Sequence, residues 1–143
     1  MSSSVYVVGI DTSESSRRVI EYAMQRAKAD GARLQLIHVI DWSPFEFHTL
    51  EENESQSIKR REQIEQDRQM VFGPIVENMQ EAGIEANVEV IYGHPAQVLA
   101  NAAESLDADG IILGRSSHKR LFGLGSTPAR VAAVSKCPVT TVP

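Results

Sequence analysis

Five short apolar runs alternate with segments of helical periodicity, and this alternation constrains the fold more than any other feature of the sequence. The runs are rich in β-branched residues, as buried strands are, and they cover residues 5–10, 33–40, 86–92, 110–113 and 138–142. Consecutive parallel strands need a long crossover connection, which is usually a helix. The sequence therefore predicts an α/β fold with a doubly wound, five-stranded parallel sheet, in one domain over residues 1–143.

Stretches between these runs carry apolar residues at helical spacing. These stretches lie within residues 13–31, 57–82, 93–110 and 128–136. Residues 42–57 show neither period and are expected to form a mobile connection. Gly73 and Pro74 predict a kink or local break in the second helix, because proline removes an amide donor and crowds the preceding turn. Lys136 is expected in the last turn of the fourth helix, where positive charge is favourable.

Composition and charge argue against several classes of function. The formal net charge is -5 and the pI is near 5.3, whereas a broad nucleic-acid-binding surface needs clustered Lys and Arg. No apolar run approaches the length of a membrane span, and the first residues lack the pattern of a secretory signal. The lone Cys137 cannot form an intramolecular disulfide. We therefore expect a cytoplasmic protein that neither binds nucleic acid nor inserts into membranes.

The loop after the first predicted strand carries a carboxylate that could serve a ligand. In doubly wound sheets, ligands bind beyond the carboxyl ends of the strands, where the strand order reverses. Asp11 follows the first strand directly, and Ser13 is a candidate cap for the first helix, with Ser16 in support. Two interpretations stay open here: Asp11 accepts hydrogen bonds from a ligand, or Asp11 and Ser13 only satisfy helix amides.

The loop after the fourth strand combines glycines, hydroxyls and positive charge. Gly114, Gly123 and Gly125 allow close backbone approach, and Thr127 followed by Pro128 is typical of a helix start. Basic residues in or beside this loop are Arg115, His118, Lys119 and Arg120. Amides converging at a helix start match a phosphate. The open alternative is a solvated loop whose hydroxyls only cap the helix.

Sharper catalytic and metal-binding motifs are missing from the sequence. Pro128 stands where the dinucleotide fingerprint needs its third glycine, and neither a Walker A sequence nor a nucleophile elbow occurs. The histidines are too dispersed for a zinc site and are expected in structural or surface roles; they are His38, His48, His94 and His118. We assign no catalytic residue and no metal site, except Asp11 as a candidate Mg²⁺ ligand.

Four sequence blocks, taken in order, resemble the universal stress protein family over essentially the whole chain. They are "VGIDTSESS", "IHVID", "YGHPAQVLANAAESLDADGIILG" and "GLGSTPARVAAVSKCPVTTVP". The resemblance implies the strand order 3-2-1-4-5 of an adenine nucleotide alpha hydrolase-like sandwich. It also implies a protein that is usually dimeric, with ATP bound in many members between strands one and four.

The resemblance also implies a nucleotide site, residue by residue. Asp11 would lie near the adenosine, the backbone of Val39 would face the adenine, and Gly114 would start the phosphate loop. The residues that would bind phosphates and ribose are Gly125, Ser126 and Thr127. Ser117 occupies the position of the family's second glycine, and ten residues separate Gly114 from Gly125 where the family pattern has twelve. The candidates to compensate with charge are Arg115, Lys119 or Arg120.

The function implied is an ATP-binding regulatory or stress-response module, with or without Mg²⁺. The alternative is a dimeric stress-response protein that has lost nucleotide binding and acts through an unidentified protein partner. The homodimer would form through the last strand, at Val139, Thr140, Thr141 and Val142. We expect at most slow ATP hydrolysis, because no positioned nucleophile or set of metal ligands accompanies Asp11.

Overall fold

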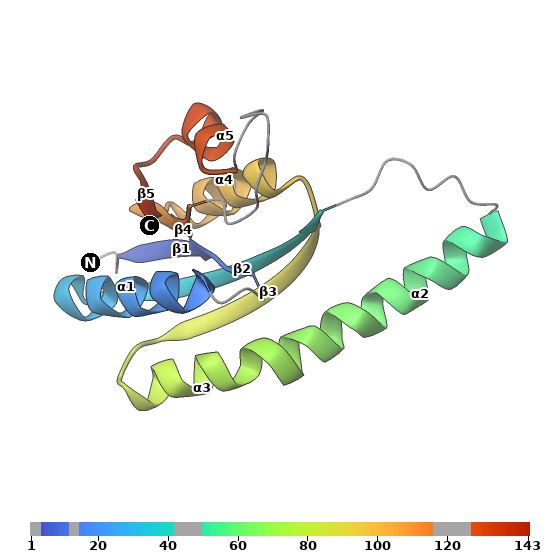
Figure 1. Ribbon diagram of the computed structural model, residues 1–143, viewed down its shortest axis with the longest axis horizontal. Coiled ribbons are helices and arrows are strands. Elements are labelled where there is room, and N and C mark those ends of the chain that lie inside the picture. Colours follow the sequence, from blue (N-terminus) through green and yellow to red (C-terminus); the bar gives the residue numbers. More distant parts are fainter. Residues whose placement is uncertain (1–3, 12–14, 42–49, 116–126) are drawn as a thin grey trace.

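A computed structural model describes residues 4–11, 15–41, 50–115 and 127–143 of the chain (Figure 1). In chain order the elements are β1 (Val5–Gly9), α1 (Ser15–Asp30), β2 (Arg33–Asp41), α2 (Leu50–Asp67), the π-helical turn η1 (Arg68–Phe72), α3 (Gly73–Glu81), β3 (Ala86–Gly93), α4 (Pro95–Leu106), β4 (Gly110–Gly114), α5 (Thr127–Val134) and β5 (Val139–Val142).

The strands form one parallel sheet in the order β3-β2-β1-β4-β5. Strand β1 lies at the centre, where Val7 pairs with Gln35 of β2 on one side and with Ile111 of β4 on the other. The predicted fold class and the strand order are therefore confirmed. Each strand lies within one residue of its predicted limits at either end. For β1 and β4 the reason is burial on both faces, which gives a continuous apolar run.

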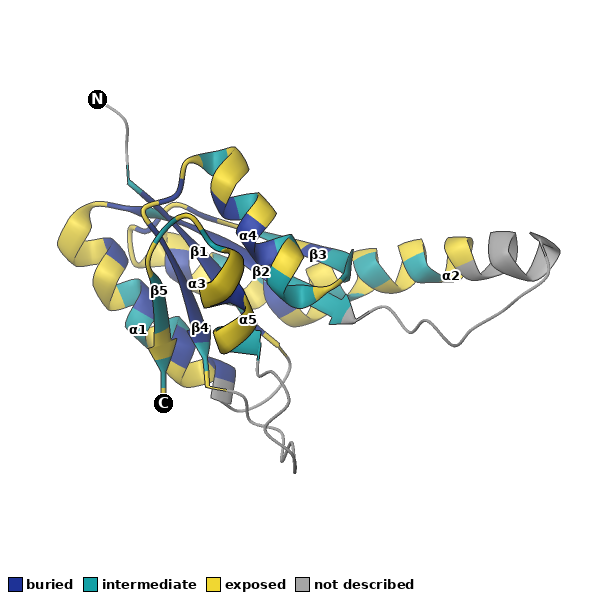
Figure 2. Cartoon of the chain, turned by 90° about the horizontal axis from the view of Figure 1, so that it is seen from above, coloured by how far each residue is buried: buried dark blue, intermediate teal, exposed yellow. Residues whose placement is uncertain are grey.

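Helices cover both faces of the sheet and enclose two apolar cores (Figure 1). One face of β1 contributes Val8 to a core that includes residues of α1, η1 and α3, and the opposite face contributes Val7 to a core that includes residues of α4 and α5. Successive side chains of a strand point to opposite faces, so neighbouring valines of β1 serve different cores. Figure 2 shows the result as buried strands between helices whose outer surfaces are exposed.

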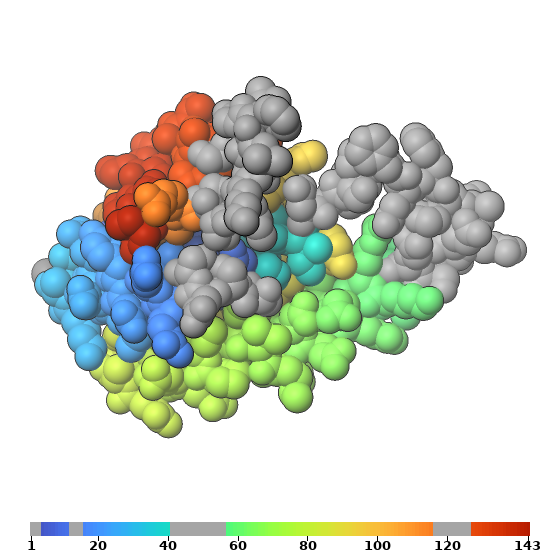
Figure 3. Space-filling model, in the orientation of Figure 1, coloured from blue at the N-terminus to red at the C-terminus, as the bar shows by residue number. Residues whose placement is uncertain are grey.

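Helix α2 extends as an arm beyond the sheet (Figures 1 and 3). It begins at Leu50, seven residues before the predicted start at Ser57. The expectation of a mobile connection over residues 42–57 is therefore wrong for its second half, and residues 42–49 lie outside the described residues. The sequence from Leu50 to Ser57 lacks apolar periodicity, but Glu, Gln and Leu are good helix formers, and this local preference prevails there.

The predicted break near Pro74 is a π-helical turn. Turn η1 spans Arg68–Phe72 and separates α2 from α3, which resumes at Gly73 with proline in its first positions. Pro74 has no amide hydrogen to bond to a carbonyl one turn back, and its ring crowds that turn, so the regular hydrogen-bond ladder cannot run through it. Within η1, Met70 is exposed whereas Phe72 is only 1% exposed and belongs to the core.

The carboxyl end of α5 differs from its prediction. The helix ends at Val134, so Lys136 lies beyond the last turn and instead pairs with Glu104 of α4 at 2.9 Å. The hydroxyl of Ser135 donates to the carbonyl oxygen of Cys137 at 2.8 Å and accepts the Cys137 amide at 3.1 Å. Serine side chains that bond to nearby backbone compete with helix continuation, which explains the earlier end.

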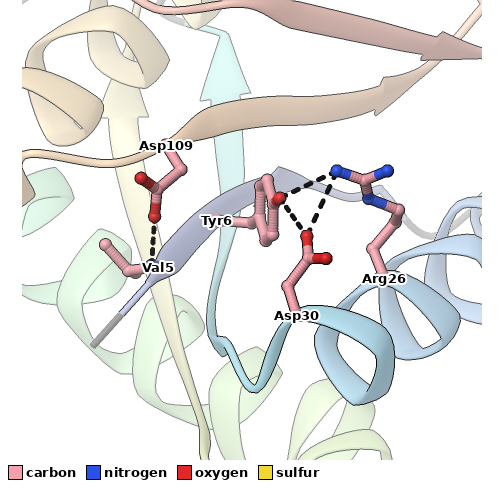
Figure 4. Close-up of polar contacts among 5 residues, drawn as sticks. All are labelled: Val5, Tyr6, Arg26, Asp30 and Asp109. Carbon is pink, nitrogen blue, oxygen red and sulfur yellow. Dashed lines mark hydrogen bonds and ion pairs between the residues drawn. The ribbon is translucent and has the colours of Figure 1, made fainter.

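Polar contacts at the amino ends of β1 and β4 tie the sheet to its surroundings (Figure 4). The amide of Val5 donates to Oδ2 of Asp109 at 2.9 Å. The hydroxyl of Tyr6 donates to Oδ2 of Asp30, and Arg26 contacts both partners. This cluster lies at the end of the sheet opposite to the loops that carry the candidate ligand residues, so its role is structural.

Candidate functional site

The strand order reverses between β1 and β4, and three predicted site residues lie at the carboxyl ends of the strands there. Gly9, the last residue of β1, pairs with Ile37 of β2 and with Leu113 of β4. Two residues further along each segment stand Asp11, Val39 and Arg115, so this register brings the three to the same level of the sheet. A reversal of strand order is where open α/β sheets bind ligands.

Asp11 is held by the first turn of α1. Its amide donates to Oγ of Ser16 at 2.8 Å, and the Ser16 hydroxyl donates to Oδ1 of Asp11, also at 2.8 Å. Ser16 is 7% exposed, whereas Asp11 is exposed. These bonds join Asp11 to a side chain at the start of α1, whereas the structural interpretation predicts bonds from helix amides, and Asp11 itself is exposed. Ser13 lies outside the described residues.

The segment before Asp11 is held by β2. The amide of Ile10 donates to the carbonyl oxygen of Ile37 at 3.0 Å, and Nδ1 of His38 lies 3.0 Å from the carbonyl oxygen of Ile10. The His38 ring also packs against Phe72 of η1, with ring centroids 5.1 Å apart. The sequence predicts a structural or surface role for His38, and in the structure it has a structural role beside the candidate site.

Val39 lies in a part of β2 that continues past the end of β1. Strand β1 ends at Gly9 opposite Ile37, while β2 runs on to Asp41, paired with β3 on its other side. Val39 is half-buried and packs against the core on the α4 side of the sheet. Its side chain and that of His38 therefore serve opposite faces.

Gly114 has a packing role at the end of β4. A Cβ atom at this position would lie 3.1 Å from Cγ2 of Val19, so the glycine lets α1 lie close to the strand. The next residue, Arg115, is exposed, and its amide donates to the carbonyl oxygen of Val142 at 2.9 Å. Thr127 is half-buried and is the first residue of α5, one position earlier than predicted.

The middle of the proposed phosphate loop lies outside the described residues. This applies to the site residues Ser117, Gly125 and Ser126 and to the basic residues His118, Lys119 and Arg120. The structure describes the two ends of the loop, which are Gly114 with Arg115 at one end and Thr127 at the other.

A groove of about 540 Å³ lies beside Asp11 on the other face of the sheet from Val39. Its walls are α1 on one side and η1 with the start of α3 on the other. The lining is apolar for the most part, with charged residues on α1, and comprises Asp11, Ser16, Arg17, Ile20, Glu21, Met24, Val71, Phe72, Pro74, Ile75 and Asn78. Asp11 and Ser16 thus stand where this groove meets the carboxyl end of β1.

Neither a metal cluster nor a membrane-spanning helix occurs in the part of the chain that the structure describes. Within it, His, Cys, Asp and Glu side chains nowhere gather in groups of three that could hold a metal ion. Among the same residues, every helix is too short or too polar to cross a membrane. A role of Asp11 toward Mg²⁺ would therefore rest on this one carboxylate together with the phosphates of a ligand.

Comparison with known proteins gives concordant results. The model of the universal stress protein family matches residues 6–143. Universal stress protein MJ0531 of Methanocaldococcus jannaschii is 29% identical over 138 residues, which cover 95% of this chain and 79% of that protein. The structure of a universal stress protein in complex with cAMP is 26% identical with a TM-score of 0.65, covering 99% of this chain and 98% of the other.

A second solved structure shares the fold at lower identity. It is a universal stress protein from Archaeoglobus fulgidus in complex with dAMP, 18% identical with a TM-score of 0.66, and the alignment covers both chains completely, at 100% each. This likeness establishes the fold shared by the two chains.

Proposed function

This chain belongs to the universal stress protein family, and on that premise we propose that it binds an adenine nucleotide, with ATP as the expected ligand, and acts as a nucleotide-dependent regulatory or stress-response module. The observation that carries the proposal is the convergence of Asp11, Val39 and Arg115 beyond β1, β2 and β4, where the strand order reverses. The ligands of the two solved relatives, dAMP and cAMP, share an adenine, a pentose and one phosphate.

The adenine would bind along the extension of β2. Because β1 ends opposite Ile37, the stretch of β2 that contains Val39 has no neighbouring strand residue from β1 at its side. The edge of an adenine carries hydrogen-bond donors and acceptors. It can therefore pair with backbone amides and carbonyls of β2 there, as the backbone of an added strand would. Asp11, level with Val39 but on the β1 segment, would then face the adenosine and accept hydrogen bonds from ribose hydroxyls.

The phosphates would bind on the β4 side. Gly114 begins the loop, Arg115 follows it with a positive charge, and Thr127 opens α5, whose amino-terminal amides favour an anion. Within the loop, Ser117, Gly125 and Ser126 are proposed to complete the cradle. The loop is shorter than the family pattern and has a serine at position 117 in place of glycine. The exposed guanidinium of Arg115 is proposed to compensate by binding the phosphates through its positive charge.

Catalysis is not the proposed role of this site. Phosphoryl transfer needs a positioned nucleophile and metal-bound phosphates, and Asp11 is the single carboxylate that we assign there. We expect at most slow ATP hydrolysis.

The second candidate is a dimeric interaction protein that has lost nucleotide binding. It is favoured by the position of β5 at the edge of the sheet. There the outward-facing backbone amides and carbonyls of residues 139–142 can pair with those of a second copy. The serine at position 117 in place of the family's glycine points the same way.

One experiment separates the two candidates. The protein is purified natively and denatured, and the released small molecules are identified by chromatography and mass spectrometry, with ATP binding measured by equilibrium dialysis in parallel. Near-stoichiometric adenine nucleotide is expected, and Gly125→Arg should abolish it by filling the crevice. The control Gln66→Arg adds the same side chain at an exposed position of α2 and should bind normally. Absence of both released and added nucleotide from the unaltered protein would make the interaction protein the leading function.

A further inference from the structure

Hydrogen bonds from two different elements hold the Ile10–Asp11 segment. From β2, the carbonyl oxygen of Ile37 accepts the Ile10 amide at 3.0 Å, and His38 Nδ1 bonds to the Ile10 carbonyl oxygen at 3.0 Å. From α1, Ser16 Oγ accepts the Asp11 amide and donates to Asp11 Oδ1, both at 2.8 Å. The backbone from the Ile10 amide to the Asp11 amide is thus bonded within the chain at each successive polar atom.

Ser16 fixes the carboxylate and the backbone of Asp11 together. A hydroxyl has one hydrogen and two lone pairs. Because the Asp11 amide already supplies a hydrogen to Ser16 Oγ, the hydroxyl hydrogen is directed to Asp11 Oδ1. Ser16 is 7% exposed, so little water competes for these bonds. The arrangement sets both the backbone position and the side-chain direction of Asp11.

His38 fixes the residue before it. A carbonyl oxygen only accepts hydrogen bonds, so the hydrogen between His38 and Ile10 belongs to Nδ1. The ring is held in turn by Phe72 of η1, at a centroid distance of 5.1 Å and an interplanar angle of 42°. The next residue on β2, Val39, packs on the opposite face of the sheet, and its backbone is proposed to face the adenine. Strand β2 thus contributes one residue to the proposed nucleotide site and one to its support.

We infer that Ser16 and His38 are positioning residues, which hold Ile10–Asp11 in its ligand-binding geometry before a nucleotide arrives. The geometry of this inference rests on the hydrogen bonds above, and its consequence for affinity rests on the proposed function. A segment that is already ordered loses less conformational freedom on binding. Part of the nucleotide affinity therefore comes from Ser16 and His38, which hold the Ile10–Asp11 segment in place.

Variants at Ser16 test the hydroxyl. Ser16→Ala is expected to weaken adenine nucleotide binding about tenfold, since it removes both bonds to Asp11, and Ser16→Thr, which keeps the hydroxyl, is expected to retain most of the affinity. The matched control is Ser135→Ala, which also removes a hydroxyl bonded to backbone, but at Cys137 before β5. This control should leave nucleotide affinity unchanged.

Variants at His38 test the ring nitrogen. His38→Asn places an amide N–H near the position of Nδ1 and should preserve more affinity than His38→Leu, which has no donor. Equal affinities of these two variants would show that His38 acts through its bulk alone, and that result would overturn its positioning role.

A readout without nucleotide keeps the inference separate from the proposed function. Amide hydrogen exchange of Asp11 is followed by NMR in the unliganded protein, with Val8 and Leu36 in the buried centre of the sheet as internal references. In Ser16→Ala, exchange at Asp11 should accelerate at least about tenfold while the references stay protected. The ¹⁵N shift of His38 Nδ1 should be that of a protonated nitrogen.

The outcomes are distinct. Unaltered Asp11 exchange in Ser16→Ala would overturn the inference, whether or not nucleotide binds. Accelerated exchange with unchanged nucleotide affinity would show that the hydrogen bonds exist but do not position the site, which also overturns it. An unaltered protein that binds no adenine nucleotide would overturn the proposed function, and the exchange measurement would then still decide whether Ser16 holds Asp11.

Discussion

The hydroxyl of Tyr6 donates a hydrogen bond to Oδ2 of Asp30, 2.5 Å away, and so joins the first strand of the sheet to the last turn of α1. Arg26, one turn earlier on α1, donates to the same hydroxyl at 2.9 Å and pairs with Asp30 at 3.2 Å (Figure 4). Tyr6 is 9% exposed. The hydrogen bond to Asp30 raises the pKa of Tyr6, because ionisation would remove the donated hydrogen and leave two negative charges in contact.

Tyr6→Phe should lower the free energy of unfolding by about 1 kcal/mol at neutral pH, because it removes the hydroxyl and keeps the ring. The raised pKa fixes the sign of the pH dependence. The contribution is fully present below about pH 10, the ordinary tyrosine value, and is lost as pH rises through the higher pKa of the folded state.

The measurement is urea unfolding of both proteins from pH 7 to pH 11. The difference between them should shrink above pH 10, whereas a constant difference over the whole range would contradict the raised pKa. Comparing the two proteins at each pH removes the effects of lysines and other tyrosines that titrate in the same range.

Gly93→Ala should destabilise the protein by about 1–3 kcal/mol, the usual cost of an overpacked atom. A Cβ at position 93 would lie 2.8 Å from Cγ2 of Val98, so β3 could not pass this close to the start of α4. The companion variant Val98→Ala removes the clashing atom, and the double variant should therefore lose less stability than the sum of the two single ones. Strictly additive losses in urea unfolding would mean that the contact with Val98 is not the cause.

The central strands are predictable from the sequence because burial on both faces leaves a clear local pattern. Strand β4, for example, is a continuous apolar run with glycine at both ends. The arm is harder for the opposite reason. The sequence from Leu50 to Ser57 has no apolar residues at helical spacing, so the periodicity that separates helices from loops elsewhere in the chain does not predict this part of α2.

The support of the candidate site needed three-dimensional information. His38 and Ile10 are separated by 28 positions, and their hydrogen bond depends on the register of β1 against β2. That register follows from neither local propensity nor composition. The sequence predicts Ser16 only as support for the cap of the first helix, whereas in the structure it forms hydrogen bonds with Asp11, which precedes the helix. The ligand roles of Asp11, Val39 and the loop after β4 stay predictions that nucleotide binding will test.

Phe72→Ala should cost about 3–5 kcal/mol of stability, as truncation of a fully buried aromatic ring does. Phe72 is 1% exposed, belongs to the core that also includes residues of α1, α3 and the sheet, and packs on His38. The control is Met70→Ala in the same turn, where the side chain is 72% exposed and the change should stay within about 0.5 kcal/mol. Thermal or urea unfolding compares the two, and similar losses would show that η1 does not hold the arm through Phe72.

Thr141→Pro should dissociate the proposed homodimer into monomers without unfolding the sheet. The carbonyl oxygen of Pro138 accepts a hydrogen bond from Ile111 of β4, and that of Val142 accepts one from Arg115 just after β4. Because backbone groups alternate in direction along a strand, residues 138, 140 and 142 face β4 and the amide of Thr141 faces outward. Proline at position 141 removes that outward donor, and edge strands tolerate it.

Sedimentation of the unaltered protein should give a dimer, which Thr141→Pro converts to a folded monomer, while Thr141→Val, which keeps the amide, remains dimeric. A monomeric unaltered protein would refute the dimer itself. A dimer that persists in Thr141→Pro, with circular dichroism unchanged, would instead move the interface away from the outer edge of β5, because an edge-to-edge pair of strands cannot keep its central hydrogen bond without that amide.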